Sequence, residues 1–268
     1  MGSRATRYAT RFVALGYLAM LLAVPVGMIV YRTFQHGLRP VIDALTQPAA
    51  VHALQMSVLI TAIVVPINVV FGVVMALLLA RKRFPGRGVV NLLIDLPFAM
   101  SPVVIGLAMF ILYGTGGWLG DWLAARGIQV LFSLPGMVIA TAFVCLPFVV
   151  REVVPVLEEL GTDQEQAAAT LGAGPRQTFL RITLPAIRWA VVYGVVLTAA
   201  RALGEFGAVS IVSGNIVGQT QTLPLYVEER FRNFDSAGAY SAGCLLALVS
   251  LLILVAMTVL SRHRKESA

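Results

Sequence analysis

Charged residues and cysteines are scarce in this chain. Only 12% of its 268 residues are Asp, Glu, Lys or Arg, whereas 58% are hydrophobic, a balance far from that of soluble domains. The two cysteines, Cys145 and Cys244, fall within apolar segments, so no disulfide framework is expected. The three histidines, His36, His52 and His263, lack the spacing of metal ligands, and we expect no metal site. The composition predicts an integral membrane protein.

Lysine is rarer still, and its scarcity bears on the use of ATP. A phosphate-binding loop of the form G-x4-G-K-[ST] requires a lysine, and neither Lys82 in ARKRF nor Lys265 in HRKE fits that pattern. No nucleophile and base stand in a recognisable arrangement either. We therefore expect no catalytic site and no cofactor in this chain. The net charge of +7 comes from basic residues at the ends of apolar segments, which indicates a membrane protein rather than a nucleic-acid-binding one.

Six apolar segments are long enough to cross a bilayer as helices. With both termini in the cytoplasm, the proposed inner segments hold 14 of the 20 Lys and Arg residues and the outer segments hold five. This asymmetry agrees with the positive-inside rule. The sequence predicts one all-α, multi-pass transmembrane domain over residues 1–268, embedded in lipid and with both termini cytoplasmic. The six segments are about 12–31, 54–80, 89–113, 134–154, 186–213 and 237–260.

The loop between the fourth and fifth segments, residues 157–185, carries helix signals. Thr162 and Glu165 form a T-x-x-E pattern that predicts a capping box and a helix starting near Asp163. Gly172 predicts the end of that helix, because a residue without a side chain tolerates the left-handed conformation.

A second short helix should follow directly. Pro175 suits its first turn, where a missing N–H costs nothing, and Pro185 should interrupt it. A short helix, a tight turn and another helix at the membrane surface would fit a groove in a partner protein.

Two charges stand inside the fifth apolar segment. Arg201 and Glu205 are one helical turn apart in ARALGEFGAVS, where they can neutralise each other. Ionisable residues in a span are costly unless paired or solvated, so they are functional candidates. One interpretation is a self-satisfied pair that shapes a helix facing a partner subunit. The other is that this face, with Gly204 and Ser210, lines a translocation path in which Arg201 attracts an anion.

Asp95 is a further acid in an apolar segment. It lies in IDLPFAMSPVV, where Pro97 and Pro102 remove backbone hydrogen bonds, a loss tolerated only where protein or water satisfies the freed groups. We expect Asp95 to cap or anchor a proline-broken helix.

The loop also carries a recognisable motif. Gln166, Ala167, Ala168 and Gly172, followed by I-x-L-P at residues 182–185, resemble the E-A-A-x3-G-x9-I-x-L-P loop of ABC-importer permeases. Gln166 stands where the family has glutamate, and Glu165 offers a carboxylate one position earlier. In that family the loop is the coupling helix that docks on a cytoplasmic ATPase. The resemblance implies ATPase coupling for Glu165, Gln166, Ala167, Ala168, Gly172 and Ala173.

Residues 95–107 and 184–231 narrow the resemblance to the W-type permease subunit of sulfate/thiosulfate importers. This implies the type I ABC-importer permease fold in the plasma membrane of a prokaryote, and import of sulfate or thiosulfate. The implied partners are a sister permease, two cytoplasmic ATP-binding subunits that hold ATP and Mg, and an extracytoplasmic sulfate-binding protein. Molybdate and tungstate permeases share the loop and remain the alternative. A passive anion channel or a membrane-embedded enzyme is the remote alternative, which ATP-dependence of flux would separate.

Overall fold

The computed structural model describes residues 4–35 and 37–266, and every regular element within these ranges is a helix. This confirms the all-α prediction; His36 lies outside the described residues. The elements are α1 (Arg4–Phe34), α2 (Arg39–Leu45), α3 (Pro48–Arg81), α4 (Arg87–Ala99), α5 (Pro102–Tyr113), α6 (Gly120–Ala124), α7 (Leu134–Leu160), α8 (Asp163–Thr170), α9 (Pro175–Thr178), a π-helical turn (Phe179–Thr183), α10 (Leu184–Leu203), α11 (Gly207–Val212), α12 (Leu223–Arg232) and α13 (Ser236–Glu266).

The described residues include five helices long and apolar enough to cross a membrane, and a sixth if α4 and α5 form one broken span. These two helices cover the expected third segment but meet at an angle of 111°. The bend follows from Pro102, which starts α5 and forces the preceding residue out of the helical region. Ser101 accordingly has a ψ of 136° and Met100 a ψ of 142°.

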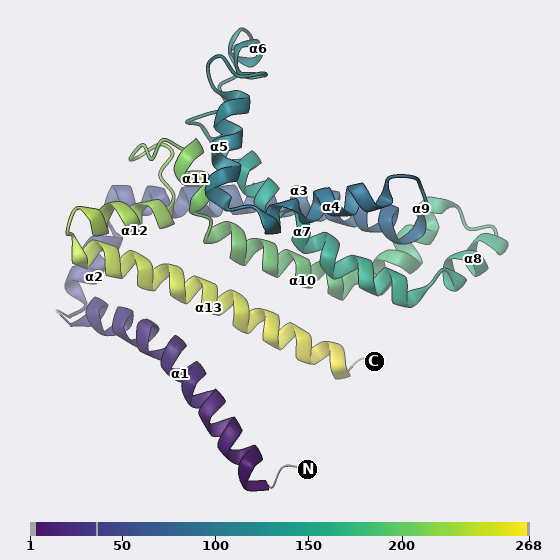
Figure 1. Ribbon diagram of the computed structural model, residues 1–268, viewed down its shortest axis with the longest axis horizontal. Helices are drawn as coiled ribbons and strands as arrows, with labels where there is room; N and C mark the ends of the chain where they lie inside the picture. Colours follow the sequence, from purple (N-terminus) through teal and green to yellow (C-terminus); the bar gives the residue numbers. More distant parts are fainter. Residues whose placement is uncertain (1–3, 36, 267–268) are drawn as a thin grey trace.

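The centre of the fold is the packing of α3, α7 and α10, which run side by side (Figure 1). Two glycines allow these helices to approach closely. A Cβ added to Gly72 of α3 would lie 2.5 Å from the Cβ of Val149, and one on Gly194 of α10 would lie 2.9 Å from the Cα of Val149. Small residues at such contacts are the usual means of close helix packing in membranes. Val149 of α7 therefore packs between Gly72 of α3 and Gly194 of α10.

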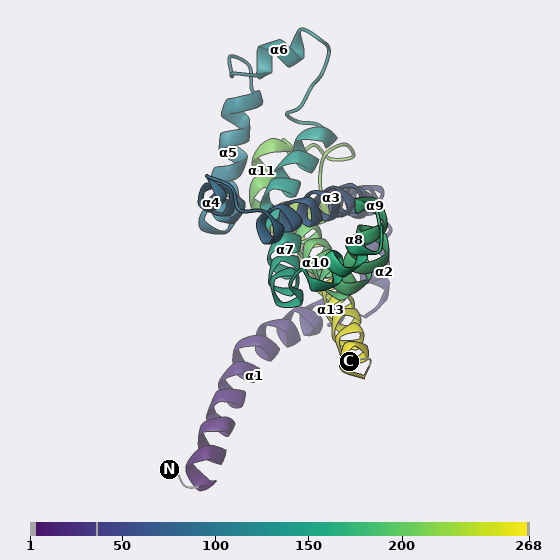
Figure 2. The same cartoon turned by 90° about the vertical axis from the view of Figure 1, so that its right-hand side faces the viewer.

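The remaining helices surround this centre unevenly. The pair α5 and α11 packs through Gly106 and Gly207, while α13 contacts α1, α2, α10 and α12. Two parts extend away from the bundle in both views: α5 with α6 at its tip, and α1 on the opposite side (Figures 1 and 2). The apolar side chains of α1 from Phe12 to Phe34 are mostly exposed.

The expected fifth segment differs from the structure at both ends. The prediction that Pro185 interrupts the second loop helix was wrong, because Pro175–Leu203 is one continuous helical run. The π-helical turn before it bonds Leu184 N–H to the Phe179 carbonyl, and this wider turn accommodates the proline ring at the start of α10. At the other end, helix α10 stops at Leu203 instead of continuing to residue 213.

Candidate functional site: the coupling loop and the break after α10

Helix α8 begins at Asp163, as its sequence predicts, but without the predicted capping box. Thr162 occupies the cap position and makes no side-chain bond to the helix backbone. Its Oγ1 instead accepts a 2.8 Å hydrogen bond from Nε2 of Gln166. The capping box fails because the Glu165 carboxylate is turned toward other helices, as described below.

Gly172 ends α8 as predicted. Its φ is +86°, and its N–H bonds the Ala169 carbonyl at 3.0 Å while the Ala173 N–H bonds the Ala168 carbonyl at 3.0 Å. These two bonds are the Schellman arrangement, which satisfies carbonyls left free at a helix end. No heavy atom outside the immediate chain lies within 4 Å of the position of a Cβ on Gly172. The glycine is therefore required by the backbone conformation and not by crowding.

The loop presents one face to the bundle and another to the surroundings. Ala168 is buried, whereas Gln166 and Ala167 are exposed and Leu171 is 89% exposed. Next to them a groove of about 440 Å³ carries two exposed arginines. It is lined by Gly174, Pro175, Arg176, Gln177, Leu180 and Arg181. The outer face of the loop thus offers apolar and cationic groups, at the end of the bundle opposite α2 and α12 (Figure 1).

Glu165 joins the ends of several helices next to α8. Its Oε2 lies 3.1 Å from Nε of Arg81, the last residue of α3, and its Oε1 accepts a 3.2 Å bond from Nη2 of the same residue. Thr183, in the π turn, donates a 2.8 Å hydrogen bond to Oε1. Nη1 of Arg81 also donates to the Leu157 carbonyl of α7 at 2.7 Å. Both oxygens of Glu165 are therefore engaged within the chain.

Sequence reasoning missed Arg81 and Thr183 as members of this site. The sequence predicts no specific role for either residue. Their partner Glu165 lies 84 and 18 positions away in the chain, so no local spacing indicates the contacts.

The break between α10 and α11 contains the predicted ion pair. Nη1 of Arg201 lies 2.5 Å from Oε2 of Glu205, which confirms the predicted pairing. Oε1 of Glu205 accepts a 2.8 Å bond from the Ala208 N–H, so the glutamate satisfies a backbone donor freed at the start of α11. The Glu205 side chain is 1% exposed and that of Arg201 is 31% exposed. Gly204 is exposed, and Ser210 donates to the Gly207 carbonyl within α11.

Asp95 anchors α4 to α7, as expected. It forms an ion pair with Arg151, which also donates a 2.9 Å bond to the side-chain oxygen of Asn91. A second, more exposed pair, Arg87 with Glu158 at 3.0 Å, joins the same two helices nearer the loop. The first half of the broken segment is thus fixed to the central bundle.

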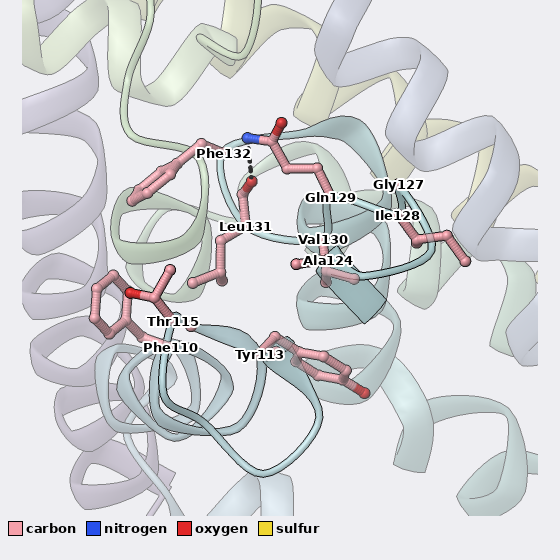
Figure 3. A pocket seen from close by; sticks show the side chains of 12 residues that line it. Phe110, Tyr113, Thr115, Ala124, Gly127, Ile128, Gln129, Val130, Leu131 and Phe132 are labelled. Carbon is pink, nitrogen blue, oxygen red and sulfur yellow. Dashed lines mark hydrogen bonds between the residues drawn. The ribbon is translucent and has the colours of Figure 1, made fainter. Parts of the chain in front are cut away.

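A separate cavity of about 430 Å³ lies between the C-terminal end of α5, α6 and the chain entering α7 (Figure 3). Its lining contains no charged side chain, and the Gln129 amide that borders it donates to the Leu131 carbonyl. The cavity therefore offers no charge complementary to an anion. Over the described residues, no three His, Cys, Asp or Glu side chains are grouped closely enough to hold a metal ion.

The short helix α8 is held at one end of the bundle between the long helices α7 and α10. The chain belongs to the family of binding-protein-dependent transport system inner membrane components, whose model matches residues 68–266. The match covers α8 and its flanking helices, so the resemblance seen in the loop is confirmed at the level of the family.

Two sequence relatives and one solved structure agree with this family assignment. The chain is 50% identical to the sulfate transport system permease protein CysW of Synechocystis over 96% of its length and 93% of that protein. It is 38% identical to the sulfate transport system permease protein CysT of Escherichia coli over 91% and 88% of the two chains. Its fold matches a chain of a bacterial alginate ABC transporter, solved with an alginate pentasaccharide-bound periplasmic protein, with a TM-score of 0.80, 16% identity and coverage of 96% and 94%.

Proposed function

We propose that this chain is the W-type permease of an ATP-driven importer that brings sulfate and thiosulfate into the cytoplasm of a prokaryote. The observation that carries the proposal is the near full-length likeness to a CysW sulfate permease, which exceeds the likeness to CysT. The partners are a CysT-type sister permease, an extracytoplasmic sulfate-binding protein and two cytoplasmic subunits that bind ATP and Mg. The distribution of basic residues supports both termini being cytoplasmic in the plasma membrane.

The outer face of the coupling loop is where the ATPase subunit docks. Exposed Leu171 at the end of α8 and the groove beside Arg176 and Arg181 support this, because together they offer a partner an apolar contact and positive charge. Docking involves Gln166, Ala167 and the Gly172–Ala173 turn. Closure of the two ATPase subunits would then displace α8 and tilt the helices attached to it, so that the path opens toward the loaded binding protein.

The break after α10 is the part of the chain that faces the translocation path. Arg201 is partly exposed while its partner Glu205 is buried, so the accessible member of the pair is the cation. Gly204 and Ser210 flank it without adding charge. This arrangement supports a role for Arg201 in attracting a dianion. Unchanged sulfate uptake by a correctly inserted Arg201→Gln protein would remove Arg201 from the path.

Uptake of radiolabelled sulfate tests the function directly. Cells lacking this chain should take up little sulfate, and restoring the chain should restore an uptake that excess thiosulfate inhibits and that depends on ATP. If molybdate accumulation depends on the chain while sulfate uptake does not, the substrate assignment fails and the molybdate alternative replaces it. Flux that persists without ATP would indicate a passive channel.

Gly172→Arg tests the docking surface in the same cells. The arginine should leave membrane insertion intact and disturb the contact between α8 and the ATPase subunit, because the substituted side chain points into open space. We expect sulfate uptake to be lost while the protein still reaches the membrane in normal amount. Coupled uptake at the level of the unmodified chain would contradict the docking assignment.

A further inference from the structure

The inner ends of α3 and α7 meet α8 and the π turn in one polar cluster, defined here as the Arg81 cluster: Arg81, Leu157, Glu165 and Thr183. It faces the bundle, whereas docking of an ATPase subunit uses the opposite face of α8. No part of the proposed docking surface requires these contacts. The cluster therefore has a role distinct from the recognition of a partner.

The charged side chains of the cluster are largely shielded from solvent, so the attraction between them is only weakly screened. The Arg81 side chain is 14% exposed and that of Glu165 is 24% exposed. A guanidinium that reaches both oxygens of a carboxylate fixes its orientation as well as its position. The carbonyl of Leu157 belongs to the last turn of α7, where carbonyls lack helical partners and the helix dipole favours a cation. Arg81 thus holds the ends of α3 and α7 together and binds α8 to both.

Thr183 extends the cluster to α10. It is 5% exposed and lies at the end of the π turn, from which α10 continues without interruption. A π turn shifts the faces of the helix on either side of it, and such turns occur often at functional positions. In this chain the last residue of the turn directs its hydroxyl at Glu165. The Glu165 carboxylate therefore contacts α3 through Arg81 and the turn that leads into α10 through Thr183, and Arg81 in turn links it to the end of α7.

We propose that Glu165 is a positioning residue that ties the coupling helix to α3, α7 and α10, so that these three spans move with α8 as one body. This rests on the proposed function, in which α8 receives the displacement of the ATPase subunit. Without the tie, α8 could still dock but would shift relative to the spans. Glu165 would then affect how much transport each ATP drives, while its loss would leave the docking surface in place.

The assembled importer, reconstituted in vesicles with its ATPase and binding-protein subunits, tests this with Glu165→Gln. The amide keeps an acceptor for Thr183 and loses the charge that holds Arg81. We expect normal co-purification of the ATPase subunits, retained ATP hydrolysis, and sulfate uptake per ATP reduced several-fold, because α8 would then shift without carrying the three spans with it. The matched control is Glu158→Gln, which removes a more exposed glutamate paired with Arg87 on the same side of the bundle and should leave the ratio unchanged.

A second pair of variants separates positioning from folding. Thr183→Ser keeps the hydroxyl and should retain the uptake-to-hydrolysis ratio, whereas Thr183→Val should lower it in the same direction as Glu165→Gln. An unchanged ratio in both Glu165→Gln and Thr183→Val would overturn the proposal. Loss of ATPase co-purification in Glu165→Gln would also overturn it, because that result assigns Glu165 to direct docking. If Gly172→Arg leaves coupled uptake intact, the docking assignment itself fails, independently of the cluster.

Discussion

Two Arg–Glu pairs lie at the two candidate sites of this permease, one at the break after α10 and one beside α8. They differ in how far apart their two members lie in the sequence. At the break after α10, Glu205 contacts Arg201 four positions before it and the Ala208 N–H three positions after it. At the end of the bundle next to α8, Glu165 contacts Arg81, which lies 84 positions away. The first pair shapes a bend within one segment. The second pair joins separate helices.

This difference separates two kinds of function. A local pair can fix the shape of a break and present a charge there, but it cannot carry a displacement between helices. A pair that joins two separate helices can carry such a displacement. Between the two regions lies the contact of Gly72 and Gly194 with Val149, where α3 and α10 both pack on the same residue of α7. The local pair therefore matches a role in the path, and the long-range pair matches a role in coupling.

Breaking the local pair should have the largest effect on stability. Arg201→Gln leaves the Glu205 carboxylate buried without a cation, and we expect the free energy of unfolding to fall by about 3 kcal/mol, the lower end for a broken buried pair because Arg201 is partly exposed. Denaturant titration of the purified protein in detergent measures this. The double variant Arg201→Gln with Glu205→Gln should recover part of the loss, since the uncharged amide still accepts from Ala208. Equal stability of the single variant and the unmodified chain would show that Glu205 does not depend on Arg201.

The close contact between the two regions should be the next most sensitive. Gly72→Ala places a Cβ 2.5 Å from that of Val149, so the helices must move apart, at an expected cost of about 1–3 kcal/mol. Thermal unfolding in detergent measures it, with Gly88→Ala as the control because no atom lies within 4 Å of that position. If the two variants unfold alike, the close packing of α3 and α7 is not required.

A smaller effect is expected in the coupling loop. Gly172→Ala meets no neighbouring atom, and its cost is that of holding an L-residue at positive φ, about 1–2 kcal/mol. The strain should loosen the end of α8 locally, so hydrogen exchange should accelerate at the N–H groups of Gly172 and Ala173. Gly172→Asn should exchange more slowly than Gly172→Ala, because asparagine tolerates this conformation better. Identical exchange in all three proteins would argue against strain at this position.

The smallest effect should come from the exposed pair that joins α4 and α7. The Arg87 and Glu158 side chains are 42% and 52% exposed, and Arg87→Gln should lower the free energy of unfolding by less than about 1 kcal/mol. The same denaturant titration detects it, and added salt should reduce the difference between variant and unmodified protein. A loss as large as that of Arg201→Gln would show that exposure does not distinguish the ion pairs.

Five features could be predicted from the sequence: the all-helical class, the apolar segments, the start of α8 at Asp163, its end at Gly172, and the pairing of Arg201 with Glu205. The first two follow from composition, and the other three depend on residues within about one or two helical turns of each other, where glycine conformation and side-chain spacing act directly. The same local reasoning failed for the capping box at Thr162, because the side chain of Glu165 found partners outside its own helix.

Which distant residues meet could not be predicted from the sequence, because it depends on how the helices pack. The contact of Arg81 with Glu165, the ion pair of Asp95 with Arg151, and the placement of Val149 between two glycines depend on how α3, α4, α7 and α10 pack. The helix that continues through Pro185 was not predicted either, because the preceding π turn makes room for the proline ring. Local patterns fix local structure since the interacting groups are near in the chain, whereas contacts between helices depend on the whole packed bundle.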